Sequence, residues 1–532
     1  MRAHLATMVG LSVPPLYVGI TILIGWLARR HDGAARESGS NDFLNASRSL
    51  PLWVVAAAFL SANCGALEII GLSAVAAQYG VQAFHFYWIG AIPGLVFVSG
   101  VMIPVYMRSG ARSLPDYLER RFDARVRLAN ACLVLVTGTA LSGIGLYAMA
   151  EVLRVTFGWT FSSGVLVAAA SVLLYVVLGG VRATIYNEVF QLVVIVLGLL
   201  PLLWLSTTVF HRPVGRGGEH WHLWTGMPLV ASHASMDGLG VVVGLGFVLS
   251  FSYWCTDFVM IQRTLAARNV ESARLVPLLA GFGKLGFSML VVAPALGAAA
   301  YLGSRMPQLY DETLPTLMAA SFPPILLGLG MTMLLASLMN GLAANVSAAS
   351  AVWTEEIYRA TLVKYAAEEH YISMGRAAAV VSIVLSIGAS YVSLYFRDLM
   401  EYVQLIFSLC GAPFFAVFFI GVFTRRATAR GALAGLSSGI LLAFTHHLLV
   451  ALRVLHYGSL MSANFYVAIA AFAVSLLVGL AASRPTEQKK DDELGSLVFS
   501  RCGAMLAKPS RLWWGLAAGL LLACGILNYL WR

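Results

Sequence analysis

Residues 50–75 read LPLWVVAAAFLSANCGALEIIGLSAV, an apolar run that is interrupted by SANCG at 61–65 and that carries a glutamate, Glu68, just after the interruption. The run is long enough to cross the hydrocarbon core of a bilayer, which needs roughly 20 apolar residues in a helix. A charge at mid-bilayer costs at least about 2.5–3.5 kcal/mol on insertion scales, so Glu68 is expected to face the protein interior or a wet cavity. The stretch predicts a broken membrane-spanning helix with a polar site at its break.

The composition extends this prediction to the whole chain. Of its 532 residues, 59% are hydrophobic and 11% are charged, whereas a soluble domain has roughly 45–50% apolar and about 25% charged residues. Apolar runs of spanning length recur from end to end and predict an all-α integral membrane protein of about fourteen transmembrane helices. The predicted spans are residues 7–28, 50–75, 81–107, 128–153, 161–181, 185–208, 237–260, 275–303, 323–350, 377–396, 400–423, 430–452, 462–482 and 512–530.

The formal net charge of +10 is explained by the loops between these spans. With an external N-terminus, the internal loops hold 26 of the 35 Lys and Arg residues, the external segments hold eight, and Lys284 lies inside a span. Cytoplasmic loops of membrane proteins carry such an excess. The distribution predicts a multi-pass protein of the cell membrane with its N-terminus outside. It indicates the lipid bilayer, and neither a nucleic acid nor a protein, as the partner of the positive charge.

Sequence patterns of catalysis and metal binding are scarce. The six cysteines stand singly, without the CxxC spacing of metal sites. No Walker A sequence, GxSxG elbow or catalytic histidine constellation stands in a suitable context, so the chain is predicted not to be an enzyme. The charge rings and repeated filter sequences of ion channels are also missing. An HxH pattern at 220–222 leaves a metal site open beside the commoner interpretation of a polar loop.

Charged residues and a second interruption mark a polar interior. Glu188 and Lys284 lie in other apolar runs and, like Glu68, are expected to contact a ligand, an ion or a charged partner. The run 237–260 is interrupted near residues 250–254 by small and hydroxyl residues, in the stretch GLGFVLSFSYWCTDFVM. Broken helices in the second and seventh spans are typical of transporters built from inverted repeats, in which unwound backbone binds substrate and cations. The pattern predicts a small-solute transporter, although small residues also serve ordinary helix packing.

Six longer motifs follow one another along the chain. They are SANCG (61–65), SLPDYLERRF (113–122), GGVRATIYNEVFQ (179–191), YWCTDFVMIQRTLAARN (253–269), SLMNGLAANVSAASAVWTEEIY (337–358) and YVQLIFSLCGAPFFAVFFIGVFTRR (402–426). In this order they resemble the sodium/solute symporter family, and specifically its sodium/glucose cotransporter branch. The resemblance extends over most of the chain.

This resemblance implies a leucine-transporter-like core of five-plus-five inverted repeats with discontinuous helices. Residues 1–49 are then a first helix and an internal loop, residues 50–425 are the ten-helix transport core, and residues 426–532 are three C-terminal helices with a polar internal linker at 483–511. The implied function is secondary active symport of a small polar solute, sugar- or polyol-like, by alternating access with a sodium gradient and no other cofactor. A solute sensor derived from a transporter is a further alternative.

The resemblance also implies which residues contact the solute. Five of seven positions keep the residue types of the glucose branch, whereas Glu68 stands in place of a histidine and Tyr87 in place of a glutamate. Amides, an ammonium group and a phenol suit a hydroxyl-rich ligand. The two replacements argue against simply assigning glucose, and they favour an amino sugar, a polyol or a cationic solute. The implied substrate-binding residues are Asn63, Glu68, Tyr87, Tyr253, Trp254, Lys284 and Gln404.

A sodium site is implied at five positions. The backbone carbonyls would come from Ser61 and Cys64, and the side chains from Ser337, Asn340 and Gly341. Ser337 keeps a hydroxyl group, Asn340 offers an amide oxygen, and Gly341 offers no side chain where the family usually has serine. Because hard cations need several oxygen ligands, the sodium site is expected to be weakened.

Two coupling hypotheses follow from this departure. In the first, sodium still binds, with Asn340 completing its ligand shell. In the second, a proton replaces sodium, and Glu68 or Glu188 is the carboxylate that titrates. Glu188 stands where the family carries an aspartate linked to cation coupling, so the resemblance implies a coupling role for it.

Overall fold

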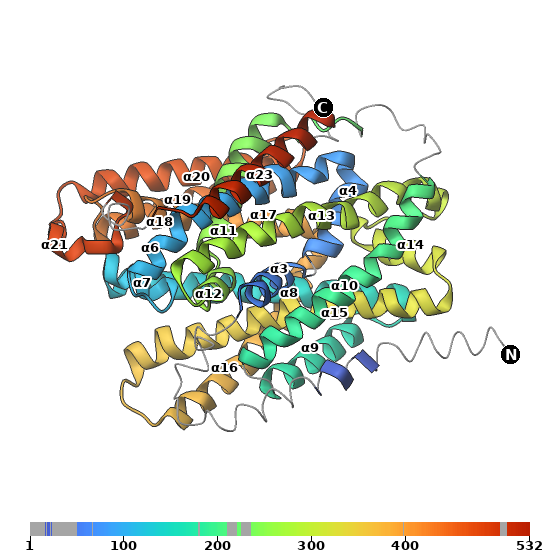
Figure 1. Cartoon of the computed structure of the whole chain (residues 1–532), viewed down its shortest axis with the longest axis horizontal. Helices are drawn as coiled ribbons and strands as arrows, with labels where there is room; N and C mark the ends of the chain where they lie inside the picture. Colours follow the sequence, from blue (N-terminus) through green and yellow to red (C-terminus); the bar gives the residue numbers. More distant parts are fainter. Residues whose placement is uncertain are drawn as a thin grey trace.

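The structure is a computed structural model that describes residues 16–17, 19–21, 23, 51–65, 67–178, 181–209, 221–224, 236–396, 398–500 and 508–531. These residues form helices and no strand, and most helices lie along one common axis (Figure 1). Eleven helices are long and apolar enough to cross a membrane, or up to twelve when the bent pair Gly240–Thr256 and Phe258–Leu265 counts as one span. The predicted all-α membrane fold is therefore confirmed.

The count of fourteen spans is not confirmed. Two of the predicted spans contain shorter apolar helices, Leu52–Asn63 and Phe161–Leu173. The first predicted span, 7–28, falls almost entirely outside the described residues, as do the internal loop 29–49 and part of the linker 483–511.

The first half of the chain contains α3 (Leu52–Asn63), η2 (Leu67–Gly71), α4 (Leu72–Tyr79), η3 (Gly80–Phe84), η4 (Phe86–Ala91), α5 (Ile92–Phe97), η5 (Val98–Met102), α6 (Ile103–Arg108), α7 (Leu114–Arg121), α8 (Ala124–Phe157), α9 (Phe161–Leu178), α10 (Val181–Val209), η7 (Gly240–Leu249), α11 (Ser250–Thr256) and α12 (Phe258–Leu265). The second half contains α13 (Val270–Leu302), η8 (Gly303–Arg305), η9 (Tyr310–Glu312), α14 (Thr313–Ser321), α15 (Pro324–Ala351), η10 (Val352–Leu362), α16 (Glu368–Val392), η11 (Ser393–Tyr395), α17 (Leu399–Ile406), η12 (Phe407–Gly411), α18 (Ala412–Phe423), α19 (Ala429–Ala451), α20 (Leu460–Ser483), α21 (Asp491–Leu494), η13 (Gly495–Leu497) and α23 (Arg511–Leu530).

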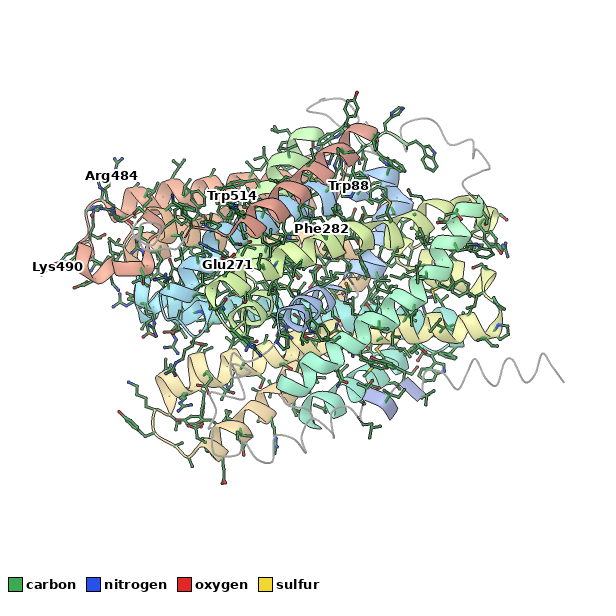
Figure 2. The ribbon with its side chains drawn as sticks, viewed as in Figure 1. Trp88, Glu271, Phe282, Arg484, Lys490 and Trp514 are labelled. Carbon is green, nitrogen blue, oxygen red and sulfur yellow. The ribbon has the colours of Figure 1, made fainter. Side chains whose placement is uncertain are left out.

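The sides of the helix bundle are apolar and at least one of its ends is charged. Figure 2 shows Phe282 of α13 and Trp514 of α23 along the side of the bundle, and both side chains are exposed. Arg484 and Lys490 lie at one end, where α20 passes into α21. Exposed apolar side chains between charged ends are what a bilayer requires of a protein surface.

The two predicted helix interruptions are both present, and the second lies later than predicted. The first follows α3, at Cys64 and Gly65, as expected from the SANCG stretch. The second was expected near residues 250–254, but α11 continues to Thr256, whose hydroxyl group donates to the Ser252 carbonyl at 2.6 Å. The bend of 52° comes at Asp257, whose backbone is extended. Its carboxylate accepts a hydrogen bond from Met260 N at 2.9 Å and caps α12.

The first break packs tightly against α15. A Cβ atom added to Gly65 would lie 3.3 Å from Gly341 Cα, so the two backbones nearly touch there. The absence of side chains at both positions permits this approach. It brings the interrupted backbone within hydrogen-bonding reach of α15.

Two buried carboxylates hold the start of α17. Asp398 Oδ1 accepts a hydrogen bond from Met400 N at 2.6 Å, and Asp311 Oδ1 accepts one from Leu399 N at 3.2 Å. Burial, together with the nearby carboxylates of Glu151 and Glu401, raises the pKa of Asp311 to about 8. Burial also raises the pKa of Asp398 well above its usual range. Both carboxyl groups therefore keep their protons to a higher pH than exposed acids do.

The raised pKa of Asp311 predicts that stability depends on pH. An acid whose pKa is higher in the folded chain than in the unfolded chain stabilises the fold at low pH, and this contribution is lost as the pH rises towards the folded value. We expect the unfolding temperature in detergent to fall as the pH is raised from about 4 to about 8, and Asp311→Asn to remove much of that slope. Asp237→Asn is the matched control, because buried Asp237 caps a different helix. An unchanged slope in Asp311→Asn would contradict the assignment.

Candidate functional site

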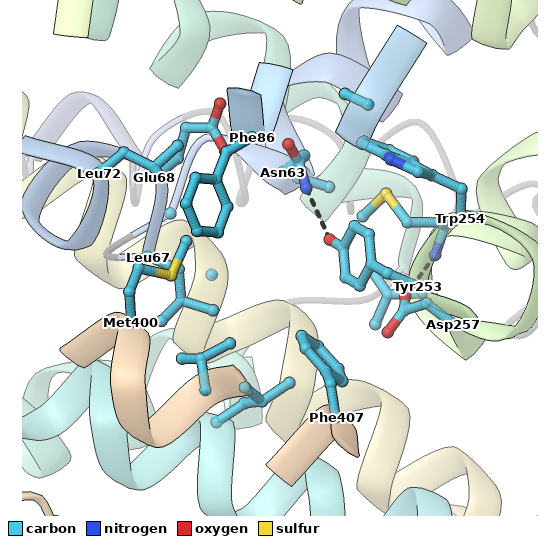
Figure 3. A pocket seen from close by; sticks show the side chains of 18 of the residues that line it. Asn63, Leu67, Glu68, Leu72, Phe86, Tyr253, Trp254, Asp257, Met400 and Phe407 are labelled. Carbon is cyan, nitrogen blue, oxygen red and sulfur yellow. Dashed lines mark hydrogen bonds between the residues drawn. The ribbon is translucent and has the colours of Figure 1, made fainter. Parts of the chain in front are cut away.

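All seven predicted substrate-binding residues line one cavity between the two breaks. The cavity has a volume of about 140 Å³, and Figure 3 shows it from close by. Asn63 ends α3, Glu68 begins the helix beyond the first break, and Tyr253 and Trp254 lie in α11 just before the second. The remaining predicted residues in the lining are Tyr87, Lys284 and Gln404.

The two broken helices meet through a side-chain hydrogen bond. Asn63 Nδ2 donates to the Tyr253 hydroxyl at 2.6 Å, the dashed line at the centre of Figure 3. The amide oxygen of Asn63 has no hydrogen-bond partner among the described residues, and the buried amide oxygen of Gln404 has none there either. A buried acceptor without a donor costs about 1–3 kcal/mol. The two oxygens are therefore ready to accept hydrogen bonds from a bound molecule.

A buried ion pair occupies another side of the cavity. Lys284 Nζ lies 2.5 Å from Glu68 Oε1, and the two side chains are only 3% and 10% exposed. The ammonium group also lies 5.4 Å from the Tyr87 ring centroid and 5.8 Å from the Trp254 ring centroid. The carboxylate and the aromatic rings together compensate the buried positive charge. This explains how Glu68 and Lys284 are both tolerated within the membrane.

Aromatic rings form the apolar wall. The Tyr253 ring lies edge-on to Trp254, with centroids 4.9 Å apart, and also to Phe407, at 5.6 Å. Such a wall suits the C–H face of a small ring or chain, while the amide oxygens address its polar edge. The cavity can thus select a small molecule that has both kinds of surface.

Sequence reasoning gave no role to several residues of the lining. Asp257 is one of them, and its place directly after the YWCT stretch was a usable signal, because Asp commonly begins a helix. Phe407 and Met400 also line the cavity. They look like any other apolar residue of a membrane span, so no sequence signal could have found them.

The residues predicted to bind sodium also lie together, but they form hydrogen bonds with one another. The Ser337 hydroxyl group donates to the Cys64 carbonyl at 2.8 Å. Asn340 Nδ2 donates to the Ser61 carbonyl at 2.7 Å and to the Ser61 hydroxyl oxygen at 3.0 Å. Gly341 packs against Gly65 without a side chain. The carbonyl oxygens expected to bind a cation therefore accept hydrogen bonds from α15.

The proposed coupling residue Glu188 joins this network through its backbone, while its carboxylate is paired with Arg263. Its backbone carbonyl accepts a hydrogen bond from the Ser61 hydroxyl group at 2.5 Å. Its carboxylate is fully buried and lies 2.5 Å from Arg263 Nη2. Glu188 is not among the residues that line the cavity.

Metal binding elsewhere finds no support in the described part of the chain. No group of three or more His, Cys, Asp or Glu residues there could hold a metal ion. The predicted HxH pattern at 220–222 is not tested, because His220 falls outside the described residues.

The sequence of most of the chain matches the model of a known protein family. The model described as "Sodium:solute symporter family" matches residues 43–439, which is most of the chain. The chain belongs to the sodium:solute symporter family. The prediction of a membrane transporter, and not an enzyme, is thereby confirmed.

Curated relatives of this chain are, by their names, cotransporters of glucose and of myo-inositol. The chain is 26% identical over 472 residues to a sodium/glucose cotransporter of Vibrio parahaemolyticus, covering 82% of this chain and 84% of that one. It is 27% identical over 547 residues to sodium/glucose cotransporter 1 of Ovis aries, covering 92% and 80%. It is 26% identical over 576 residues to a sodium/myo-inositol cotransporter of Mus musculus, covering 96% and 78%.

Solved structures share the fold of this chain. A Na+-coupled sialic acid symporter in a substrate-bound outward-open state aligns with a TM-score of 0.74 at 16% identity, covering 91% of this chain and 99% of that one. Mhp1, a nucleobase-cation-symport-1 family transporter, aligns with a TM-score of 0.51 at 14% identity, covering 87% and 98%. The predicted transporter architecture with discontinuous helices is confirmed.

The buried ion pair of Glu68 and Lys284 predicts a pattern of stability. Glu68→Gln or Lys284→Met leaves one buried charge without its partner, and each is expected to cost about 3–5 kcal/mol. The double variant removes both charges and is expected to cost less than the sum of the two. Thermal unfolding of the purified protein checks this. Glu355→Gln, which breaks the more exposed pair with Arg359, should cost less than about 1 kcal/mol. Additive losses in the double variant would refute the coupling.

Proposed function

We propose that this chain is a secondary active symporter that takes up a small polar solute, sugar- or polyol-like, by alternating access. The observation that carries the proposal is the pair of buried amide oxygens, of Asn63 and Gln404, that lack donors in a cavity walled by aromatic rings. Hydroxyl groups are donors that would satisfy both oxygens, while the Trp254 ring would cover the apolar face of the solute.

The charge of the cavity also bears on the solute. The Glu68 carboxylate and the Lys284 ammonium group neutralise each other at 2.5 Å. An anionic solute would have to compete with Glu68 for Lys284, and a cationic solute would have to draw on Glu68 or on Asp257, whose carboxylate already caps α12. A neutral, hydroxyl-rich solute needs no such exchange, and it agrees with the names of the relatives, which include glucose and myo-inositol cotransporters.

We place the protein in the cell membrane with its N-terminus outside. The excess of Lys and Arg in alternate loops supports this orientation. The ten-helix core is proposed to be residues 50–425, with the three C-terminal helices beyond it.

Two ions are candidates for coupling. Sodium is favoured by the family and by the names of the relatives. A proton is favoured by a different observation: the Ser61 and Cys64 carbonyls already accept hydrogen bonds from Asn340 and Ser337. For proton coupling, Glu68 and Glu188 remain the proposed carboxylates, although each is ion-paired in the structure.

The solute class predicts the result of a binding screen. Purified protein, heated with sugars, polyols, amino acids and carboxylic acids, is expected to be stabilised by a member of the first two groups. Gln404→Leu removes one acceptor and should weaken that binding by roughly five- to tenfold, the value of one hydrogen bond of about 1 kcal/mol.

Asn528→Leu is the matched control, because it removes an amide from α23, outside the cavity lining. Stabilisation by amino acids or carboxylic acids alone would contradict the proposed solute class.

The coupling ion predicts the driving force of uptake. Proteoliposomes that hold the protein are expected to accumulate the stabilising solute under an imposed sodium or proton gradient, and only slowly without either. Comparison of a sodium gradient at equal pH with a proton gradient in choline buffer identifies the ion. Accumulation under neither gradient would reject secondary active symport, even if the solute binds.

A further inference from the structure

The network between the first helix break and α15 is complete without an ion. At the end of α3, the Ser61 carbonyl accepts one hydrogen bond from Cys64 N at 2.8 Å and another from Asn340 Nδ2 at 2.7 Å. A carbonyl oxygen has two lone pairs, so both are occupied. The Cys64 carbonyl accepts from the Ser337 hydroxyl group at 2.8 Å.

The same network fixes which way the Asn340 amide points. Its NH2 group has two hydrogens, and both have an acceptor: the Ser61 carbonyl oxygen and the Ser61 hydroxyl oxygen, at 2.7 and 3.0 Å. The Ser61 hydroxyl hydrogen is itself donated to the Glu188 carbonyl, at 2.5 Å. A reversed amide would bring its oxygen against two oxygens that have no hydrogen to give. The nitrogen therefore faces Ser61.

A sodium ion at this place would find an unsuitable set of ligands. It would need several hard oxygen ligands, yet Asn340 presents a nitrogen donor and Gly341 presents no side chain. Gly341 also lies against Gly65, where an added Cβ would be 3.3 Å from backbone. The nearest carboxylate on α10, that of Glu188, is bonded to Arg263 and does not balance an added positive charge.

An amide NH2 group, through its partly positive hydrogens, and a cation can each stabilise the partial negative charge of a carbonyl oxygen. We infer that the Asn340 amide stands in the place of a coupling cation between α3 and α15, so that solute uptake does not depend on sodium held at Ser61 and Cys64. The statement about uptake rests on the proposed function. The statement about the site concerns ion binding alone and is tested without any solute.

With the Asn340 amide in the place of an ion, side-chain hydrogen bonds hold the broken helix. A bound ion comes and goes with its concentration, whereas a side chain is present in every state of the protein. The hydrogen bonds from Asn340 and Ser337 hold the break of α3 against α15 at any sodium concentration, and any motion of one helix along the other must carry or break them.

Direct binding of 22Na+ to purified protein tests the inference. In choline buffer, the wild-type protein and Ser337→Ala are expected to bind the same amount of 22Na+, because the wild type holds no sodium at this site. Asn340→Ser frees a lone pair on the Ser61 carbonyl and replaces the amide with a hydroxyl oxygen, so it is expected to show saturable 22Na+ binding that the wild type lacks. Asn340→Ala is the second variant if the serine variant does not fold. Asn528→Ser, which shortens an amide on α23, should leave binding unchanged.

The outcomes separate this inference from the proposed function. Saturable 22Na+ binding by the wild type that Ser337→Ala abolishes would overturn the inference, as would a failure of both Asn340 variants to gain binding. Sodium binding by the wild type that survives Ser337→Ala lies elsewhere and agrees with the inference at this site. If no sugar or polyol stabilises the protein, the proposed solute is wrong, and the 22Na+ result still stands.

Discussion

Backbone polar groups within a membrane must be satisfied inside the protein, and the end of α3 is where this requirement becomes hardest to meet. The break at Cys64 and Gly65 releases carbonyls that a continuous helix would have bonded internally. α15 meets the need with Ser337 and Asn340, and this requires the close approach of Gly65 to Gly341. The position of the cavity follows, because Asn63 and Glu68 stand on either side of the same break.

The second constraint is charge. Glu68 is acceptable at this depth because Lys284 is bonded to it, and Glu188 because Arg263 is bonded to it. Both pairs join segments far apart in the chain, so each also fixes how two helices lie relative to one another. The cavity also presents amide oxygens and aromatic rings, which suit an uncharged polar solute.

Local patterns in the sequence predicted a large part of this. The apolar runs predicted the spans, and SANCG predicted the first break, because small and polar residues release a helix where they stand. Family resemblance brought together seven residues that line one cavity. The direction of the Asn340 amide could not be predicted, since it depends on Ser61, 279 residues away. The second break was placed too early, because hydroxyl residues that can bond back to their own helix, as Thr256 does, were taken as helix-breaking.

The contact between Gly65 and Gly341 has a mechanical meaning. A close backbone contact beside the first break can serve as a pivot point. The helical segment Leu67–Phe84 begins just beyond this point and is the arm that would turn about it. Glu68 is three residues from Gly65 and Tyr79 is fourteen, so at about 1.5 Å per residue the lever ratio is about five. If the segment turned as a rigid body about Gly65, a displacement of Glu68 would be about five times larger at Tyr79.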